Sequence, residues 1–200
     1  MSKKIIFIIG SLRKNSFNRQ MAKEAKNLIG DRAEVEFLEY EDIPFMNQDI
    51  EFPTPSAVDR VRNIVKGADG IWIFTPEYNH QIPGVLKNLL DWLSRPIDPK
   101  NFSAGTAVSG KATTISGAGG KNQTKGCREN LDVLLEFMKM NVMKDKETGV
   151  LLPQEAFMSG NFEISNEIRE QLLEQVNAFL DFIWWYICQG KLDNCFRRQN

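Results

Sequence analysis

The feature that most constrains this 200-residue chain is an alternation of strand-like and helix-like segments, repeated about five times. Residues 4–9 form a run that is continuously apolar from Ile5 and ends at Gly10. This is the pattern of a strand buried on both faces of a parallel sheet. Apolar residues at helical spacing follow and stop at Gly30. Because the alternation recurs along the chain, it predicts an open, doubly wound α/β sheet with helices on both faces.

The apolar patterns place each element along the chain. Strands are expected at residues 4–9, 35–38, 71–74 and 112–115, and helices at 21–29, 57–68, 85–93, 131–138 and 164–187. The fifth strand has two candidate places, around Val142 or at residues 150–152. We expect a single domain over residues 1–189, followed by a C-terminal tail over residues 190–200.

Charge and hydropathy exclude several classes of partner. The chain has 25 Lys and Arg against 26 Asp and Glu, which gives no reason to expect nucleic acid or an anionic membrane surface. Its apolar runs are too short for a signal peptide or a membrane span. Three cysteines without a CxxC pair favour free thiols, and a single histidine argues against a His-ligated metal site. A small-molecule partner and a cytoplasmic location are expected.

The loop after the first strand leads directly into a helix. In a doubly wound sheet, ligands bind beyond the carboxyl ends of the strands. A helix N-terminus offers unpaired N–H groups and a positive dipole end, which suit a phosphate. The side chains that could assist are Ser11, Arg13, Ser16 and Asn18. The loop predicts a monophosphate site, but an ordinary polar loop whose Ser and Asn residues cap the helix would have the same sequence. Neither GxxxxGK[ST] nor a GxGxxG after this strand is present, which argues against nucleotide hydrolysis and the usual dinucleotide binding.

The loop after the third strand is rigid, aromatic and polar. Pro76 and Pro83 fix the backbone on either side of it, so that the Tyr78 ring can be held ready for a ligand at little cost in ordering. A planar, partly polar ring is the expected guest. The alternative is a rigid connection that merely exposes polar residues. The loop after the fourth strand, residues 116–120, is rich in glycine, which permits close approach of a flat ligand but is also typical of a flexible turn.

Two residues could carry chemistry of their own. His80 is the only histidine, and it could serve as an acid or base, but no Ser-His-Asp arrangement can be assembled around it. A structural or surface role for His80 is the alternative. Cys127 lies near the start of a helix, where a thiolate could be stabilised, although an inert thiol is the simpler interpretation.

Together, the three loops resemble the NAD(P)H-dependent FMN reductase family of flavodoxin-like proteins, which includes quinone, azo-dye and chromate reductases. The resemblance spans roughly residues 4–140 and is most specific over 76–96. The matching residues are Gly10 to Arg13, Ser16, Asn18, Pro76 to Asn79, Pro83, Gly84, Leu86 to Asn88, Asp91, Trp92, Ser94 to Pro96 and the 116–120 loop. Two features depart from the family pattern: His80 stands where relatives often have a small residue, and the tail has no evident counterpart.

The resemblance implies a five-stranded parallel sheet of order 2-1-3-4-5, FMN as cofactor and NADH or NADPH as co-substrate. It implies that the FMN phosphate is held by Ser11, Arg13, Ser16 and Asn18, with Phe17 nearby. It implies that the ribityl chain and ring are lined by Pro76, Glu77, Tyr78 and Asn79, and approached by Ser116, Gly117, Gly119 and Gly120. Family members form homodimers or homotetramers, and the third helix with Trp92 is the expected contact.

The implied activity is hydride transfer from NAD(P)H through FMN to a quinone, an azo compound, a metal oxyanion or free flavin. The flavin would carry the chemistry, so no catalytic side chain is expected, and His80 would contact the substrate. Two other functions are compatible with the same motifs. One is a flavodoxin-like electron carrier, and the other is a flavin-sensing interaction module without nicotinamide oxidation.

Overall fold

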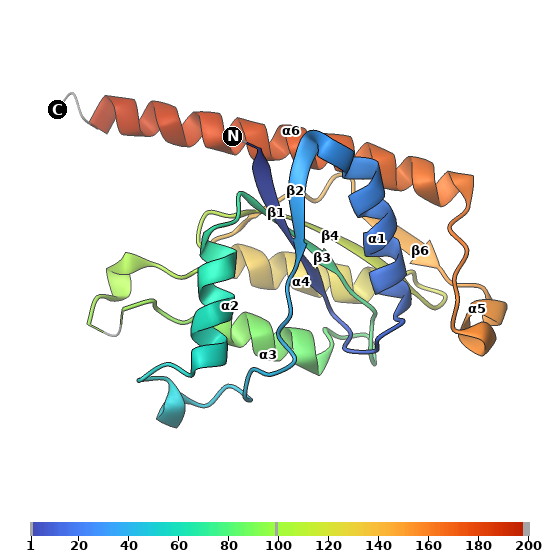
Figure 1. Ribbon diagram of the computed structural model, residues 1–200, viewed down its shortest axis with the longest axis horizontal. Coiled ribbons are helices and arrows are strands. Elements are labelled where there is room, and N and C mark those ends of the chain that lie inside the picture. The colour runs from blue at the N-terminus through green and yellow to red at the C-terminus, as the bar shows by residue number, and fades with distance from the viewer. Residues whose placement is uncertain (1, 99, 198–200) are drawn as a thin grey trace.

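Two strands with long apolar runs, β1 (Lys3–Ile9) and β3 (Gly70–Phe74), pair in parallel at the centre of one sheet. The computed structural model describes residues 2–98 and 100–197 (Figure 1). The other strands are β2 (Ala33–Phe37), β4 (Ala112–Gly119), β5 (Asn141–Val142) and β6 (Thr148–Leu151). All pairs are parallel, and the order β2-β1-β3-β4-β5 confirms the expected flavodoxin-like arrangement.

The fifth position of the sheet is shared by two short strands. β5 pairs with the start of β4 at Ala112 and Thr113, whereas β6 pairs with the end of β4 from Ser116 to Gly119. Both predicted places for the fifth strand are therefore strands, separated by a loop.

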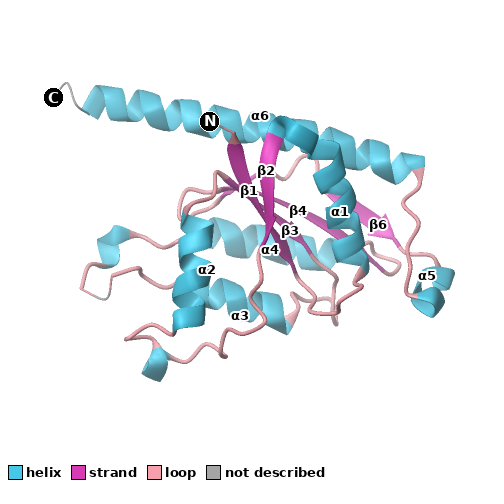
Figure 2. Cartoon of the chain, viewed as in Figure 1, coloured by secondary structure: helices cyan, strands magenta, loops and turns pink. Residues whose placement is uncertain are grey.

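Helices cover both faces of this sheet, as expected (Figure 2). They are α1 (Phe17–Ile29), α2 (Ser56–Lys66), α3 (Gly84–Leu93), α4 (Lys125–Phe137), α5 (Gln154–Ser159) and α6 (Asn166–Arg197), with 3₁₀ turns at Gly30–Arg32, Gln48–Ile50 and Phe102–Ala104. α1 and α6 pack on one face, and α2, α3 and α4 pack on the other. Because α6 continues to Arg197, it crosses the boundary expected between residues 1–189 and 190–200, and that division stays a prediction.

Aromatic side chains fill the core beneath α6. Trp72 stacks on Phe74 and meets Phe7 and Phe179 edge-on, with ring centroids 5.1 to 5.6 Å apart. All four side chains are fully buried, and such aromatic pairs add to the free energy gained from burial. The centre of the sheet is thereby fixed, and its carboxyl edge carries the loops of interest.

The third helix does not present the surface expected for a subunit contact. Trp92 is only 1% exposed, and its indole N–H donates a 2.8 Å hydrogen bond to the Pro44 carbonyl oxygen. The apolar stripe of α3 is likewise buried in the second core, against the sheet. The prediction that Trp92 and the apolar face of α3 contact another subunit is corrected, since both are buried within the domain itself.

Within the part of the chain that the structure describes, none of the helices combines the length and apolarity that crossing a membrane requires.

Candidate functional site

A cleft of about 400 Å³ lies at the carboxyl edge of the sheet, where the loops after β1, β3 and β4 meet. It is lined by Ser11, Arg13, Ser16, Phe17, Asn18, Pro76, Glu77, Tyr78, Ala118, Gly119, Gly120, Leu152 and Phe157. Most of the residues predicted for the site thus line one cleft. Three predicted residues, Asn79, Ser116 and Gly117, are not among its lining residues, and Ala118, Leu152 and Phe157 were not predicted.

One corner of the cleft is the N-terminus of α1. The Ser16 hydroxyl caps this helix by accepting the Arg19 N–H at 3.1 Å, and the Ser11 hydroxyl accepts the Arg13 N–H at 3.4 Å. The N–H groups of Phe17 and Asn18 belong to the first helical turn, which has no intrahelical acceptors. Together with the positive end of the helix dipole, these donors suit an anion.

The Arg13 side chain supplies the positive charge of this corner. Its guanidinium carbon lies 4.5 Å from the centroid of the Phe17 ring, within the range of a cation–π interaction. Phe17 in turn meets Phe157 edge-on, with ring centroids 5.6 Å apart. A guanidinium, two rings and a helix terminus therefore stand on one side of the cleft.

Asn18 has a different role from the one predicted. Its side-chain amide donates to the Ala118 carbonyl oxygen at 3.0 Å and accepts the Ala118 N–H at 2.8 Å. Since Asn18 is 2% exposed, its side chain is committed to joining α1 to the end of β4. Only its backbone N–H remains available for a phosphate at the helix terminus.

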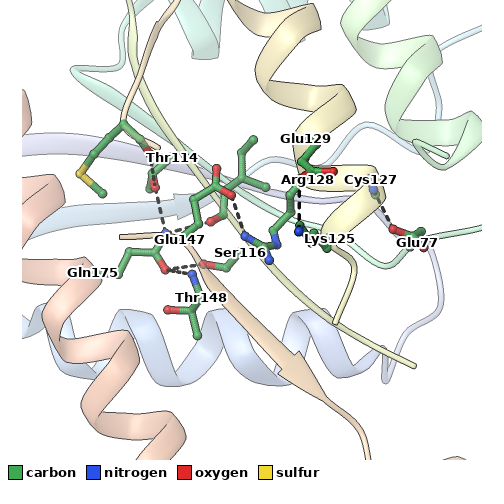
Figure 3. A network of polar contacts seen from close by, with 12 residues as sticks. Glu77, Thr114, Ser116, Lys125, Cys127, Arg128, Glu129, Glu147, Thr148 and Gln175 are labelled. Carbon is green, nitrogen blue, oxygen red and sulfur yellow. Dashed lines mark hydrogen bonds and ion pairs between the residues drawn. The ribbon is translucent and has the colours of Figure 1, made fainter. Parts of the chain in front are cut away.

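Glu77 is bound to the start of α4 (Figure 3). Its carboxylate, 8% exposed, accepts the Cys127 N–H at 2.7 Å and is hydrogen bonded by the Asn122 amide. Burial raises the pKa of Glu77, but these hydrogen bonds, the Gly126 N–H and nearby His80 together hold the pKa below its usual value. The ionised Glu77 side chain therefore caps α4 from outside the helix, in place of a capping side chain at the N-cap residue itself.

Residues 78–81 form a tight turn with Asn79 and His80 at its centre, and the first residue of the turn, Tyr78, lines the cleft. Tyr78 and Gln81 exchange backbone hydrogen bonds of 3.2 and 2.9 Å, and Asn79 and His80 both have positive φ, of 55° and 60°. This is the geometry of a type I′ turn, which favours Asn and Gly at its centre. The His80 side chain is 85% exposed, with Nδ1 3.1 Å from Glu77 Oε1. His80 therefore lies outside the cleft lining, at the outer side of the Glu77 carboxylate.

Ser116 faces the core instead of the cleft. β4 extends to Gly119, so Ser116 is still within a strand that is buried on both faces. Its hydroxyl accepts the Trp72 indole N–H at 2.9 Å. The same hydroxyl donates to Gln175 Oε1 at 2.8 Å (Figure 3). Both hydrogen-bonding functions are used inside the protein, so this side chain is not free to approach a ligand as predicted.

The first glycines of the 116–120 loop make room for Thr124. A Cβ at Gly117 would collide with the Thr124 hydroxyl and lie 2.6 Å from the Thr75 carbonyl oxygen. A Cβ at Gly119 would lie 2.7 Å from Thr124 Cγ2, whereas one at Gly120 would meet nothing within 4 Å. Gly117 is thus required by internal packing, Gly119 packs against Thr124 on one side and lines the cleft on the other, and Gly120 leaves open space.

Two further walls of the cleft come from the segment after the fifth strand. Leu152 follows β6 directly, and Phe157 lies on α5. The rule that ligands sit beyond the carboxyl ends of parallel strands applies to this loop as well. It could have indicated this segment once residues 150–152 were considered as a strand.

Cys127 is an unreactive thiol, as the simpler interpretation held. It is fully buried, and burial raises the pKa of its thiol to about 11 despite a contact with the Thr75 hydroxyl. At neutral pH the nucleophilic thiolate is therefore absent.

Comparison with known proteins gives one consistent family. A sequence model described as NADPH-dependent FMN reductase matches residues 3–150. An NAD(P)H-dependent FMN reductase of Pseudomonas aeruginosa is 32% identical over 177 residues, which cover 88% of this chain and 92% of the relative. A quinone reductase of Escherichia coli K12 is 33% identical over 183 residues, which cover 90% and 94% of the two chains.

A solved structure supports the same relationship. The flavoenzyme NAD(P)H:(acceptor) oxidoreductase from Paracoccus denitrificans superposes with a TM-score of 0.80 at 27% identity. The alignment covers 92% of this chain and 98% of that one. The similarity in fold thus extends beyond the matched residues 3–150, into the segment that carries Leu152 and Phe157.

Proposed function

This chain belongs to the NADPH-dependent FMN reductase family, and on that premise we propose that it binds FMN in the cleft and uses NADH or NADPH to reduce a small-molecule acceptor, with quinones as the first candidates. The observation that carries the proposal is the anion-binding corner at the start of α1, which opens into a cleft large enough for a planar ring.

The corner fits a flavin phosphate by its chemistry. Ser11 and Ser16 have hydroxyl hydrogens that can still be donated, because in the structure both oxygens act as acceptors. The Arg13 guanidinium stands at the same corner, and it can bind phosphate oxygens in a bidentate manner. The N–H groups of Phe17 and Asn18 complete a set of donors suited to a dianion.

The remainder of the cleft fits a flat, partly polar ring. Pro76 and Tyr78 form one side on a backbone that the two-residue turn holds rigid, and Gly119 and Gly120 form another side that has no protruding side chain. Bound FMN would supply the redox chemistry, by taking two electrons from the nicotinamide and giving them to the acceptor. The protein itself binds and orients the reactants; Glu77 is committed to capping α4 and Cys127 is protonated.

The name of the Escherichia coli relative, quinone reductase, supports quinones as the first acceptors to test. Azo compounds, metal oxyanions and free flavin are the other acceptors to compare. We propose that His80 contacts the acceptor, because its exposed side chain lies on the same turn as Tyr78, which lines the cleft. Replacing His80 with Ala should then change the KM for a quinone and leave the Kd for FMN unaltered.

We further propose that the protein is a cytoplasmic homodimer or homotetramer. Val133 and Phe137, one helical turn apart on α4, are 70% and 83% exposed, which is unusual for large apolar side chains of a monomer. Light scattering of the wild type and of the Phe137→Glu variant would test this contact, since the variant should have the mass of a smaller assembly.

Two measurements test the proposed function. The purified protein, or the protein after incubation with FMN, should show the absorption bands of bound flavin, and it should oxidise NADH or NADPH when a quinone is supplied. Binding of FMN without nicotinamide oxidation would instead indicate an electron carrier or a flavin-sensing interaction module. Failure to bind FMN would contradict the proposal.

A further inference from the structure

The segment around α5 contributes to the cleft and lies beyond the residues 3–150 that the family model matches. Phe157 on this helix lines the cleft and is 57% exposed, while the neighbouring Met158 is 83% exposed and does not line it. One aromatic side chain of α5 is therefore directed toward the site.

Hydrogen bonds hold this segment against the start of α1 (Figure 1). The Gly160 carbonyl oxygen accepts from Asn15 Nδ2 at 3.0 Å and from Gln20 Nε2 at 3.2 Å, and Gln20 Oε1 accepts the Phe162 N–H at 3.0 Å. Asn15 and Gln20 stand on either side of the Ser16 cap, and their partners directly follow α5. These hydrogen bonds therefore fix the position of Phe157 relative to the anion-binding corner.

Three side chains contact one another in a row at that corner, in the order Phe157, Phe17 and Arg13. Phe157 meets Phe17 edge-on at 5.6 Å, and the Arg13 guanidinium lies over the Phe17 ring at 4.5 Å. Among the side chains that the structure describes, those of residues 2–98, 100–101 and 103–188, none forms an ion pair with Arg13. The contact described for this long, flexible side chain is therefore with the Phe17 ring, which packs against the core on one side and meets Phe157 on another.

We propose that Phe157 is a positioning residue, which holds Phe17 so that Arg13 is oriented toward the phosphate of the flavin. The inference rests on the proposed function, because it requires a phosphorylated ligand at this corner. Preorganising a charged side chain removes part of the entropic cost of binding. Since riboflavin has the same ring but no phosphate, the effect of Phe157 should appear as selectivity for FMN over riboflavin.

The test measures the Kd values of apo-protein for FMN and for riboflavin by flavin fluorescence. In Phe157→Ala, the Kd for FMN should rise about 2- to 5-fold, which corresponds to loss of an exposed cation–π contact, while the Kd for riboflavin stays within twofold. Phe157→Tyr, which keeps an aromatic ring at this position, should retain the wild-type Kd for FMN. Met158→Ala is the matched control on the same helix and should bind both flavins as the wild type does.

A second comparison tests whether Phe157 acts through Arg13. In the Arg13→Ala background, adding Phe157→Ala should produce no further loss of FMN affinity, because the guanidinium that the ring orients is gone. An additional loss would overturn the inference, and so would an equal weakening of FMN and riboflavin, which would identify Phe157 as a wall for the ring. An unchanged FMN Kd in Phe157→Ala, or the same loss in Met158→Ala, would also overturn it. If wild-type protein binds neither flavin, the proposed function itself fails.

Discussion

The side-chain amide of Asn18 and the backbone of Ala118, 100 residues apart in the chain, form a pair of hydrogen bonds across the floor of the cleft. The pair joins the first turn of α1 to the C-terminal end of β4. These two elements carry the anion-binding corner and the glycine loop. Both partners are buried, so the loss of one leaves the polar groups of the other without their protein partner.

Replacing Asn18 with Ala should lower the free energy of unfolding by about 2 to 4 kcal/mol, because the N–H and the carbonyl oxygen of Ala118 would both be left buried without a partner. Urea unfolding monitored by circular dichroism measures this change. Asn27→Ala is the matched control, since Asn27 is exposed on the same helix and its amide donates a hydrogen bond to Glu24. A loss of under 0.5 kcal/mol in Asn18→Ala, as expected at a surface position, would contradict the role assigned to this pair.

The Glu77 carboxylate should stabilise α4, and the effect should depend on pH. Replacing Glu77 with Gln removes the negative charge from the helix N-terminus and should cost about 1 to 2 kcal/mol at neutral pH. Because the pKa of Glu77 is held below its usual value of 4.5, its contribution is complete above that value and is lost as the pH falls through the lowered pKa. The wild type and Glu77→Gln should therefore differ at pH 7 and converge in acid when unfolding is followed with urea. A constant difference down to strongly acidic pH would refute this account.

The turn at His80 should be open to stabilisation. His80 has a φ of 60°, a left-handed conformation that glycine adopts without steric cost, and its ion pair with Glu77 is too exposed to offset that cost. His80→Gly should therefore raise the free energy of unfolding by roughly 0.5 to 1 kcal/mol, and His80→Val should lower it because a β-branched residue is strained there. The thermal unfolding of the two variants gives the comparison, and an order opposite to the expected one would count against a type I′ turn.

The sequence predicts the frame of this protein well because its strongest signals are local. Continuous apolar runs mark β1 and β3, and helical periodicity marks α1 to α4, so the sheet and the loops at its carboxyl edge follow from the chain itself. The order of the strands came from the resemblance to the family, and the structure confirms it.

The sequence fails where a residue's role depends on distant partners. Ser116 was assigned to a loop because the polar residues of β4 hide the strand, yet Gln175 of α6 satisfies the hydroxyls of Ser116 and Thr114 from about 60 residues away. The Asn18 side chain is likewise committed to β4 by a contact that no local pattern indicates. Phe157 joins the cleft only because hydrogen bonds hold α5 against the start of α1.

A buried pair of acids behind the site should make stability depend on pH in the opposite direction to Glu77. Glu147 is 5% exposed and accepts a 2.8 Å hydrogen bond from Arg128, while Glu147 Oε1 and Asp132 Oδ1 are buried oxygens without a hydrogen-bond partner among the described side chains. A proton shared by the two carboxyl groups would satisfy both oxygens. Burial, followed by repulsion from Asp132, raises the pKa of Glu147 to about 8 even though Arg128 lowers it.

A raised pKa means that the folded state retains a proton that the unfolded chain has lost. The contribution to stability is therefore complete below the ordinary carboxyl value of 4.5 and is lost progressively as the pH rises to about 8, at up to ~1.4 kcal/mol per pH unit. Glu147→Gln keeps a neutral hydrogen-bonding side chain and should flatten this decline in urea unfolding between pH 5 and 8. The exposed Glu129→Gln on α4 is the matched control and should decline as the wild type does. An equal slope in Glu147→Gln and the wild type would show that the two carboxyl groups share no proton.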